Sequence, residues 1–187
     1  MKNDLSLLDH CLTPVRQLHS PNQSARDVDC AVDLLVLHNI SLPPGEFGGC
    51  HVEDFFCNNL EVGLHPFFLE IADVKVSAHL LIDRAGLITQ FVPFNRKAWH
   101  AGKSCFAGQE NCNDFSIGIE LEGTDDEHFT DAQYLSLINT TKLLMLEYPE
   151  ITEARIVGHS DIAPDRKTDP GPCFDWVRLK MGLSSDH

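Results

Sequence analysis

The sequence predicts a single α/β domain, and three segments carry that prediction. Residues 34–37 are four consecutive apolar residues between polar ends, a pattern typical of a strand buried on both faces. Residues 116–123 alternate apolar and polar side chains, as strands do. Residues 130–133 form a capping-box sequence, and apolar residues follow it at helical spacing up to residue 148. The length of 187 residues suits one domain with a sizeable core.

Composition and charge exclude several classes of function. No apolar run reaches the roughly 20 residues of a membrane span. The first ten residues lack the apolar core and cleavage site of a signal peptide, so we expect a cytoplasmic protein. The formal net charge of −14 argues against nucleic acid, large anionic polymers and anionic membranes as partners. A small soluble substrate is easier to reconcile with this charge, and nothing indicates an obligate protein partner.

Seven cysteines are scattered through the chain and form no Cys-x-x-Cys pair. Free thiols in a reducing cytoplasm are the simplest interpretation. A disulfide between Cys105 and Cys112 remains open at this point.

The first half of the chain combines irregular segments with one clear strand. Residues 1–32 are interrupted by prolines and are predicted to be irregular, packed on the domain. The strand at 33–39 places His38 at its exit, where it is either a site residue or a hydrogen-bonded core histidine. Residues 42–50 are rich in Gly and Pro and predict a loop, and 52–60 predict a short helix. Phe67 and Phe68 either cap the site or fill the core, and the core is favoured. We also expect the region 42–72 to move when substrate enters.

The second half predicts a hairpin, a strand, two helices and a short strand. Residues 76–94 predict the hairpin, with His79 in a structural role. Trp99 and His100, just beyond it, either line a pocket wall or belong to the core. The helix that begins at residue 130 ends before Pro149, and residues 154–158 form a short strand that leads into His159. A closing helix at 174–181 is expected to turn Phe174, Val177 and Met181 inward.

The alternating strand at 116–123 carries two carboxylates on one face. Ile117, Ile119 and Leu121 take the opposite face. Glu120 and Glu122 are costly if buried without a use, so one of them could be a general base. Alternatively, the strand lies at the sheet edge and both carboxylates face water.

Residues 158–172 contain His159, Lys167 and Asp169 in a segment that is too rich in Pro and Gly to predict helix or strand. A stiff loop with these side chains suits a site, although a rigid connector with solvated charges is the alternative. Taken with His38, two imidazoles and one carboxylate form a known ligand set for catalytic zinc, which keeps a fourth position for water. Glu120 would then be the base, and Lys167 a fixed positive charge.

Five phrases of the sequence together resemble the zinc-dependent N-acetylmuramoyl-L-alanine amidases, and within them the AmpD-type 1,6-anhydro-muramoyl amidases of cell-wall recycling. The resemblance covers nearly the whole chain. Its phrases are VSAHLLI (76–82), AWHAG (98–102), CNDFSIGIELEGTD (112–125), GHSDIAP (158–164) and RKTDPGP (166–172).

The resemblance implies a mixed central β-sheet flanked by helices and one Zn²⁺ per chain. It implies that His38, His159 and Asp169 are the metal ligands, and that the first carboxylate of Glu-Leu-Glu, Glu120, is the catalytic base. Lys167 would stabilise the oxyanion. Residues that match or lie near the family's muropeptide-binding positions are Asn39, Lys75, Trp99, His100, Ala101 and Arg166. In two departures, Lys75 replaces the arginine common in relatives and Asn111 replaces a basic residue, and arginine and lysine bind carboxylates differently.

The implied reaction is hydrolysis of the amide between (1,6-anhydro-)N-acetylmuramic acid and L-alanine in soluble anhydro-muropeptides. Two alternatives remain at this point: an amidase that attacks intact peptidoglycan, and a module that binds muropeptides without cutting them. The former is expected to have export or a basic face, and the latter to lack a zinc ligand.

Overall fold

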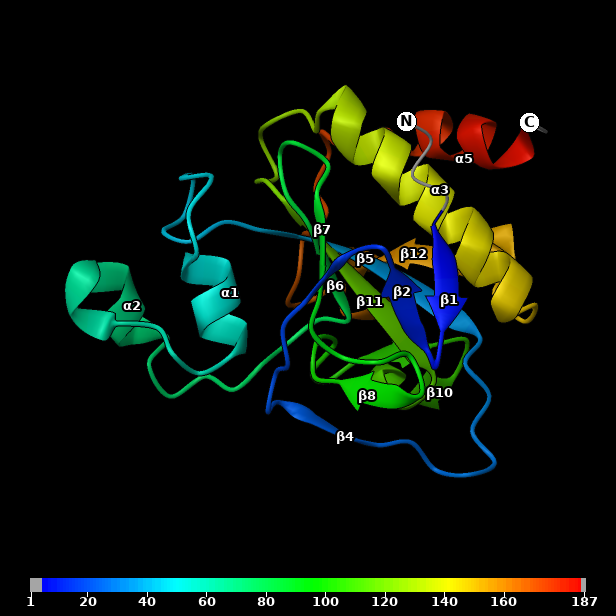
Figure 1. The fold of residues 1–187 in the computed structure, drawn as a ribbon, viewed down its shortest axis with the longest axis horizontal. Helices are drawn as coiled ribbons and strands as arrows, with labels where there is room; N and C mark the ends of the chain where they lie inside the picture. The colour runs from blue at the N-terminus through cyan, green and yellow to red at the C-terminus, as the bar shows by residue number, and fades with distance from the viewer. Residues whose placement is uncertain (1–4, 186–187) are drawn as a thin grey trace.

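The computed structural model describes residues 5–185, and within them six strands form a central sheet in the order β12–β5–β11–β6–β7–β3 (Figure 1). Strands β12, β5, β11 and β6 are parallel, whereas β7 is antiparallel to β6. The predicted mixed sheet is therefore confirmed. The bounds are Arg16–Gln17 (β3), Leu34–Ile40 (β5), Leu80–Ile82 (β6), Ile88–Gln90 (β7), Ser116–Glu122 (β11) and Ile156–Gly158 (β12).

Strand β11 lies in the middle of the sheet, between β5 and β6. All seven of its residues are buried, so the alternative that its carboxylates face water at a sheet edge is wrong. Ile117, Ile119 and Leu121 belong to the main hydrophobic core. Because side chains alternate along a strand, Glu120 and Glu122 lie on the opposite face.

Helices α3 (Asp131–Glu147) and α5 (Trp176–Ser184) pack side by side against the sheet (Figure 1). The capping box is confirmed, because the Thr130 hydroxyl accepts the Gln133 backbone N–H at 3.1 Å and the Gln133 side chain accepts the Thr130 N–H at 3.0 Å. Apolar residues of α3, among them Leu137 and Leu144, enter the same core as β11.

The inward face of α5 differs from the prediction. Val177 and Met181 are exposed by 66% and 68%, whereas Leu179 is buried in the main core. Phe174 is buried as predicted, but it precedes the first helical residue, Trp176. Because the helix begins at Trp176 and not at Phe174, a different side of it faces the core. Val177 and Met181 therefore point outward.

A separate group of short helices lies to one side of the sheet in Figure 1. It contains α1 (His51–Phe56), the 3₁₀ helix η1 (Val62–Leu64) and α2 (Pro66–Glu70). Phe56 and Phe68 form a second hydrophobic cluster with Phe91, which follows β7. The loop at 42–50 and the helix after it are as predicted, although the helix ends at Phe56. Phe68 fills the core as expected, but Phe67 is only partly buried.

Short strands occupy the N-terminal segment, which the sequence predicts to be irregular. Strands β1 (Ser6–Leu8) and β2 (Cys11–Thr13) form a hairpin, β3 joins the central sheet, and β4 (Gln23–Ala25) pairs with β8 (Arg96–Ala98). Strands of two or three residues are too short to leave a periodic pattern in the sequence. Arg26 fastens this segment to the domain by donating hydrogen bonds to backbone carbonyls that include those of Phe94 and Ser116.

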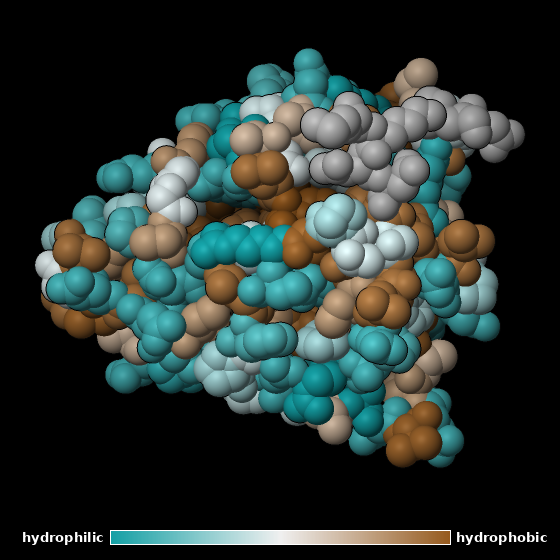
Figure 2. Space-filling view, viewed as in Figure 1, coloured by the Kyte–Doolittle hydropathy of each residue, from teal (hydrophilic) through white to brown (hydrophobic). Residues whose placement is uncertain are grey.

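The remaining elements are the strands β9 (Cys105–Phe106) and β10 (Gln109–Glu110), the 3₁₀ helices η2 (Cys112–Asp114) and η3 (Glu153–Arg155), and the helix α4 (His159–Ile162). All seven cysteines lie in the described part of the chain and are free thiols, as predicted, so Cys105 and Cys112 do not pair. Within residues 5–185, no helix is both long and apolar enough to span a bilayer. Hydrophilic residues cover most of the face in Figure 2, with hydrophobic ones in scattered groups.

Candidate metal centre and active-site cleft

Three buried side chains meet where two parallel strands end. His38 lies near the end of β5, and the neighbouring strand β12 ends at Gly158, directly before His159. The chain then folds back, because the Ser160 N–H donates to the carbonyl of Asp169 at 3.0 Å. The prediction that 158–172 holds neither helix nor strand is wrong for one turn, α4, whose Asp161 carboxylate accepts the Gly158 N–H at 2.7 Å.

The ligand atoms of His38, His159 and Asp169 converge closely. The two Nδ1 atoms are 3.0 Å apart, and the Asp169 Oδ2 lies 2.9 Å from His38 Nδ1 and 3.1 Å from His159 Nδ1. The opposite nitrogen of each ring contacts protein: His159 Nε2 lies 3.1 Å from the Ala101 carbonyl oxygen, and His38 Nε2 lies 2.9 Å from His100 Nδ1. With its hydrogen on Nε2, His159 donates to the Ala101 carbonyl and turns the Nδ1 lone pair toward the other two ligands, which is the tautomer that metal binding at Nδ1 requires.

These residues fit a zinc ion. Two imidazole nitrogens and one carboxylate oxygen are the donor set of catalytic zinc sites. Burial lowers the pKa of His38 to about 4, so the ring is neutral at neutral pH, and neutral imidazole is the metal-binding form. Each ring also has the partner on its far nitrogen that metal-binding histidines usually have.

Glu120 lies beside this group, because its backbone pairs with that of His38 across β11 and β5. Paired residues of parallel strands share a face of the sheet. Burial raises the pKa of Glu120 well above its ordinary value, and the negative charge of Asp169 adds to this, while Lys167 opposes it. Its Oε2 atom has no hydrogen-bond partner among residues 5–185. A buried carboxyl with a raised pKa is suited to proton transfer.

Glu122 has a different environment on the same face. Its Oε1 accepts the Gly48 N–H at 2.6 Å, and its Oε2 accepts the Arg84 N–H at 3.1 Å. Its carboxylate thus joins the loop 42–50 to the turn between β6 and β7. Glu122 holds two segments together, whereas Glu120 keeps an oxygen available.

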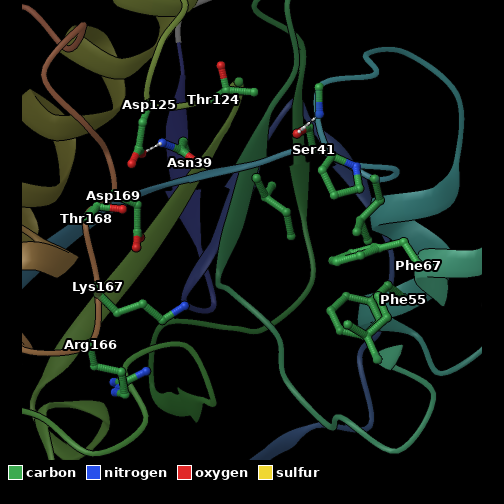
Figure 3. A pocket seen from close by; sticks show the side chains of 16 residues that line it. Asn39, Ser41, Phe55, Phe67, Thr124, Asp125, Arg166, Lys167, Thr168 and Asp169 are labelled. Carbon is green, nitrogen blue, oxygen red and sulfur yellow. Dashed lines mark hydrogen bonds between the residues drawn. The ribbon is translucent and has the colours of Figure 1, made fainter. Parts of the chain in front are cut away.

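A cleft of about 510 Å³ opens in front of Asp169 (Figure 3). One wall is polar and includes Asn39, Arg166, Lys167 and Asp169, which lie together in Figure 3, with the Lys167 side chain extended into the space. The opposite wall is apolar and includes Phe55 and Phe67 (Figure 3), and Ile71 also lines the cleft. The cleft therefore offers charge and hydrogen bonds on the side of the ligand group and an apolar surface across from it.

The structure places the predicted substrate residues in three settings. Asn39 and Arg166 line the cleft, where Asn39 donates to Asp125 at 2.7 Å and Arg166 donates to the Ala101 carbonyl at 2.8 Å. His100 and Ala101 are buried behind the two imidazole ligands.

The other two predicted residues lie further out. Trp99 is 37% exposed, and its indole N–H donates to Ser24 at 3.2 Å. Lys75 borders a smaller hollow that shares Phe55 and Ile71 with the main cleft. The part that these residues have in substrate binding stays a prediction.

Sequence reasoning favoured core packing over a place in the site for the residues of the apolar wall. Phe55 falls at helical spacing and Phe67 follows an unassigned segment, so both are indistinguishable from core residues in the sequence. Asn111, one of the two departures from relatives, has a φ of 59°, a left-handed conformation that asparagine adopts more readily than lysine or arginine. Backbone geometry therefore gives a local reason for asparagine at this position.

A second group of potential ligands, Cys50, His51 and Asp54, lies at the start of α1. Cys50 is exposed, and all three residues come from one turn of the chain. These three residues are less buried than His38, His159 and Asp169, and they do not come from separate strands that meet.

Comparison with known proteins identifies relatives over nearly the whole chain. The N-acetylmuramoyl-L-alanine amidase family matches residues 29–172. The 1,6-anhydro-N-acetylmuramyl-L-alanine amidase AmpD of Haemophilus influenzae is 56% identical over 89% of this chain and 91% of its own. The enzyme of the same name from Escherichia coli is 54% identical over 94% of this chain and 95% of its own.

Solved structures agree with the sequence matches. A crystal structure of a selenomethionine derivative of AmpD has a TM-score of 0.93 at 50% identity and covers 96% of this chain and 99% of its own. A complex of Escherichia coli AmiD with the substrate anhydro-N-acetylmuramic acid-L-Ala-D-γ-Glu-L-Lys has a TM-score of 0.61 at 28% identity, over 97% of this chain and 66% of its own. By sequence and by fold, this chain belongs to the N-acetylmuramoyl-L-alanine amidase family.

Proposed function

We propose that this chain is a zinc-dependent amidase that hydrolyses the amide bond between 1,6-anhydro-N-acetylmuramic acid and L-alanine in muropeptides. The convergence of His38, His159 and Asp169 at one end of the cleft, with Glu120 beside them, carries the proposal. The names of relatives more than 50% identical support the substrate class.

One zinc ion per chain, held by His38, His159 and Asp169, would supply a Lewis acid that lowers the pKa of water and polarises a carbonyl. Glu120 accepts a proton from the attacking water and delivers it to the alanine nitrogen as the C–N bond breaks. The products are the lactyl carboxylic acid and a peptide with a free amine, so one water is consumed. Lys167, whose side chain extends into the cleft, stabilises the negative charge that develops on the carbonyl oxygen.

The two walls of the cleft suit the two chemical parts of a muropeptide. Asn39 and Arg166 on the polar wall offer hydrogen bonds and positive charge for peptide carbonyls and carboxylates. Phe55 and Phe67 on the other wall offer apolar surface for a methyl group or a sugar face. Lys75 and Trp99 lie further from the ligand group and would contact the distal parts of a longer peptide.

We further propose that the substrates are soluble fragments and that the enzyme works in the cytoplasm. Seven free thiols suit a reducing compartment, and the net charge of −14 disfavours the anionic polymer of the intact wall. The complex of the related AmiD contains an anhydro-muropeptide, which supports the same substrate class here.

Mass spectrometry of two digests tests this proposal, one with anhydro-muropeptides and one with intact sacculi. Release of stem peptide from the soluble fragments, with much slower release from sacculi, is the expected result. Faster cleavage of sacculi would make the chain a wall-lytic amidase. Binding of fragments with no cleavage by zinc-loaded protein would make it a recognition module.

Metal removal tests the zinc chemistry directly. A chelator should abolish cleavage and added Zn²⁺ should restore it, because the ligand group supplies three of the four zinc ligands. His159→Ala should lose both zinc and cleavage. Full activity in protein shown by elemental analysis to be metal-free would contradict the mechanism. If elemental analysis instead finds two zinc ions per chain, Cys50, His51 and Asp54 would be the candidate ligands of the second ion.

A further inference from the structure

A short segment behind the metal centre contacts both imidazole ligands. The ring of His100 meets His38, with 2.9 Å between His100 Nδ1 and His38 Nε2. The carbonyl of the next residue, Ala101, lies 3.1 Å from His159 Nε2. The backbone of this segment is fixed in turn, because the Asn113 side-chain oxygen accepts the N–H groups of His100 at 3.1 Å and Ala101 at 2.8 Å.

Hydrogen-bond direction can be traced along the His100 side of this segment. The Ser116 hydroxyl lies 2.6 Å from the Cys112 carbonyl, which only accepts, so the single hydroxyl hydrogen points there. Ser116 Oγ must then accept from His100 Nε2, at 3.1 Å. A neutral His100 with its hydrogen on Nε2 has a lone pair on Nδ1, and this lone pair accepts from His38 Nε2–H. His38 is thereby left with a lone pair on Nδ1, which faces Asp169 Oδ2 at 2.9 Å and His159 Nδ1 at 3.0 Å, and a cation between these three atoms would satisfy them.

The space for the His100 ring comes from Gly118 in the middle of β11. A Cβ atom added at Gly118 would lie 2.4 Å from His100 Cγ and 2.5 Å from His100 Nδ1, closer than such atoms approach. The ring stands edge-on to His38, at 82° between the ring planes. Any side chain at residue 118 would therefore displace the ring that contacts His38.

We propose that His100 is a positioning residue that fixes the tautomer and orientation of His38 for metal binding. The His100 ring is itself fixed by its hydrogen bond to the Ser116 hydroxyl, which donates in turn to the Cys112 carbonyl. This inference rests on the proposed zinc site but assigns His100 a role apart from substrate contact. Both His100 nitrogens are engaged with protein groups, so the ring has no nitrogen left for a ligand in the cleft.

The test measures Zn²⁺ affinity by chelator competition, together with the visible spectrum of the Co²⁺-substituted protein. His100→Phe keeps a ring in the Gly118 space but removes both nitrogens. Its zinc affinity should fall about 10- to 100-fold, the usual effect of losing such a partner, and its Co²⁺ bands should shift. His100→Gln, which can both accept and donate, should recover part of the affinity. Melting of the metal-free variants checks that they fold.

A second pair of variants provides a matched control. Ser116→Ala leaves His100 in place and removes the hydrogen-bond partner of His100 Nε2. Zinc affinity is therefore expected to fall by a smaller amount, several-fold. Ser20 is equally buried and also donates and accepts one hydrogen bond, with Phe56 and Asn22, away from His38. Ser20→Ala should therefore bind zinc like the unmodified protein.

The outcomes separate this inference from the proposed function. Zinc affinities of His100→Phe and Ser116→Ala equal to that of Ser20→Ala would overturn the positioning role and leave the zinc amidase standing. Failure of the unmodified protein to bind zinc would instead overturn the zinc site itself. If His100→Phe does not fold, the comparison of Ser116→Ala with Ser20→Ala decides the question.

Discussion

Glu120 and Glu122 are two residues apart on the same strand and on the same face, yet their surroundings assign them different work. Both carboxylate oxygens of Glu122 accept hydrogen bonds from backbone N–H groups of two neighbouring segments. Glu120 keeps one oxygen without a partner in the described chain and sits level with His38. Sequence spacing cannot distinguish the two, because the difference comes from loops that reach only one of them.

Replacing Glu120 with Gln keeps the shape of the side chain and removes its ability to accept a proton. Turnover should fall roughly 10²- to 10⁴-fold, the usual contribution of a general base. Zinc content should not change, because Glu120 is not a ligand. Peptide release measured beside elemental analysis checks both points. Glu122→Gln is the comparison, and a larger loss of turnover there would move the base to Glu122.

Helix α3 begins with a side-chain cap whose contribution can be isolated. The Thr130 hydroxyl accepts from Gln133 N–H at 3.1 Å and also donates to the Arg84 carbonyl at 2.9 Å, so it ties the helix to the β6–β7 turn. Thr130→Ala should lower the free energy of unfolding by about 1 kcal/mol in urea denaturation. Thr152 is the N-cap residue directly before η3 and makes no side-chain cap bond among the described residues, so Thr152→Ala is a matched control with little expected effect.

The apolar wall of the cleft rests on the second hydrophobic cluster, which the short helices form together with residues such as Leu81 of β6. Phe56 and Phe68 pack in the second cluster, separate from the residues under α3. Segments that depend on a satellite cluster can open without global unfolding. We therefore expect residues 42–72 to exchange amide hydrogens faster than β11, and to slow when Glu120→Gln protein binds an anhydro-muropeptide. Identical exchange with and without this ligand would argue against movement of the wall.

At the scale of the whole molecule, buried neutral histidines make stability depend on pH. His79 is fully buried, accepts the Gly118 N–H and donates to the Arg96 carbonyl, both at 3.0 Å. Burial, followed by the charge of Arg26, lowers the pKa of His79 from 6.5 to about 3. Between these two pH values His79 is protonated in the unfolded chain but not in the folded chain. The free energy of unfolding therefore decreases as pH falls through this window.

This dependence can be measured against a variant that does not titrate. As pH falls below 6.5, His79 alone should remove up to about 1.4 kcal/mol of unfolding free energy per pH unit. His79→Gln keeps a donor and an acceptor but has no such proton. Urea denaturation at pH 7 and pH 5 should therefore show a steeper loss for the unmodified chain. Parallel losses in the two proteins would mean that His79 is protonated in the fold.

The sequence predicts the sheet centre and the long helix because each has a strong local pattern. The apolar runs of β5 and β11 and the capping box of α3 are examples. The three candidate ligands have only a weak pattern of their own, and the resemblance to the amidases is what assigns them. The wall position of Phe55, the outward turn of Val177 and the contacts of His100 and Ala101 with the imidazole ligands could not be predicted from such patterns. Each depends on which distant segment packs against the residue, and no spacing along the chain encodes that.

The pairing of Glu120 with His38 across two parallel strands has a consequence for how this chemistry can change. A slip of one residue between β5 and β11 would send the two side chains to opposite faces of the sheet. Insertions and deletions are therefore tolerable in the surrounding loops but not within the paired segments of β5 and β11. Transplanting the activity into another scaffold would need these two adjacent parallel strands in this alignment, and beside them a third strand that leads into His159 and a loop that returns Asp169.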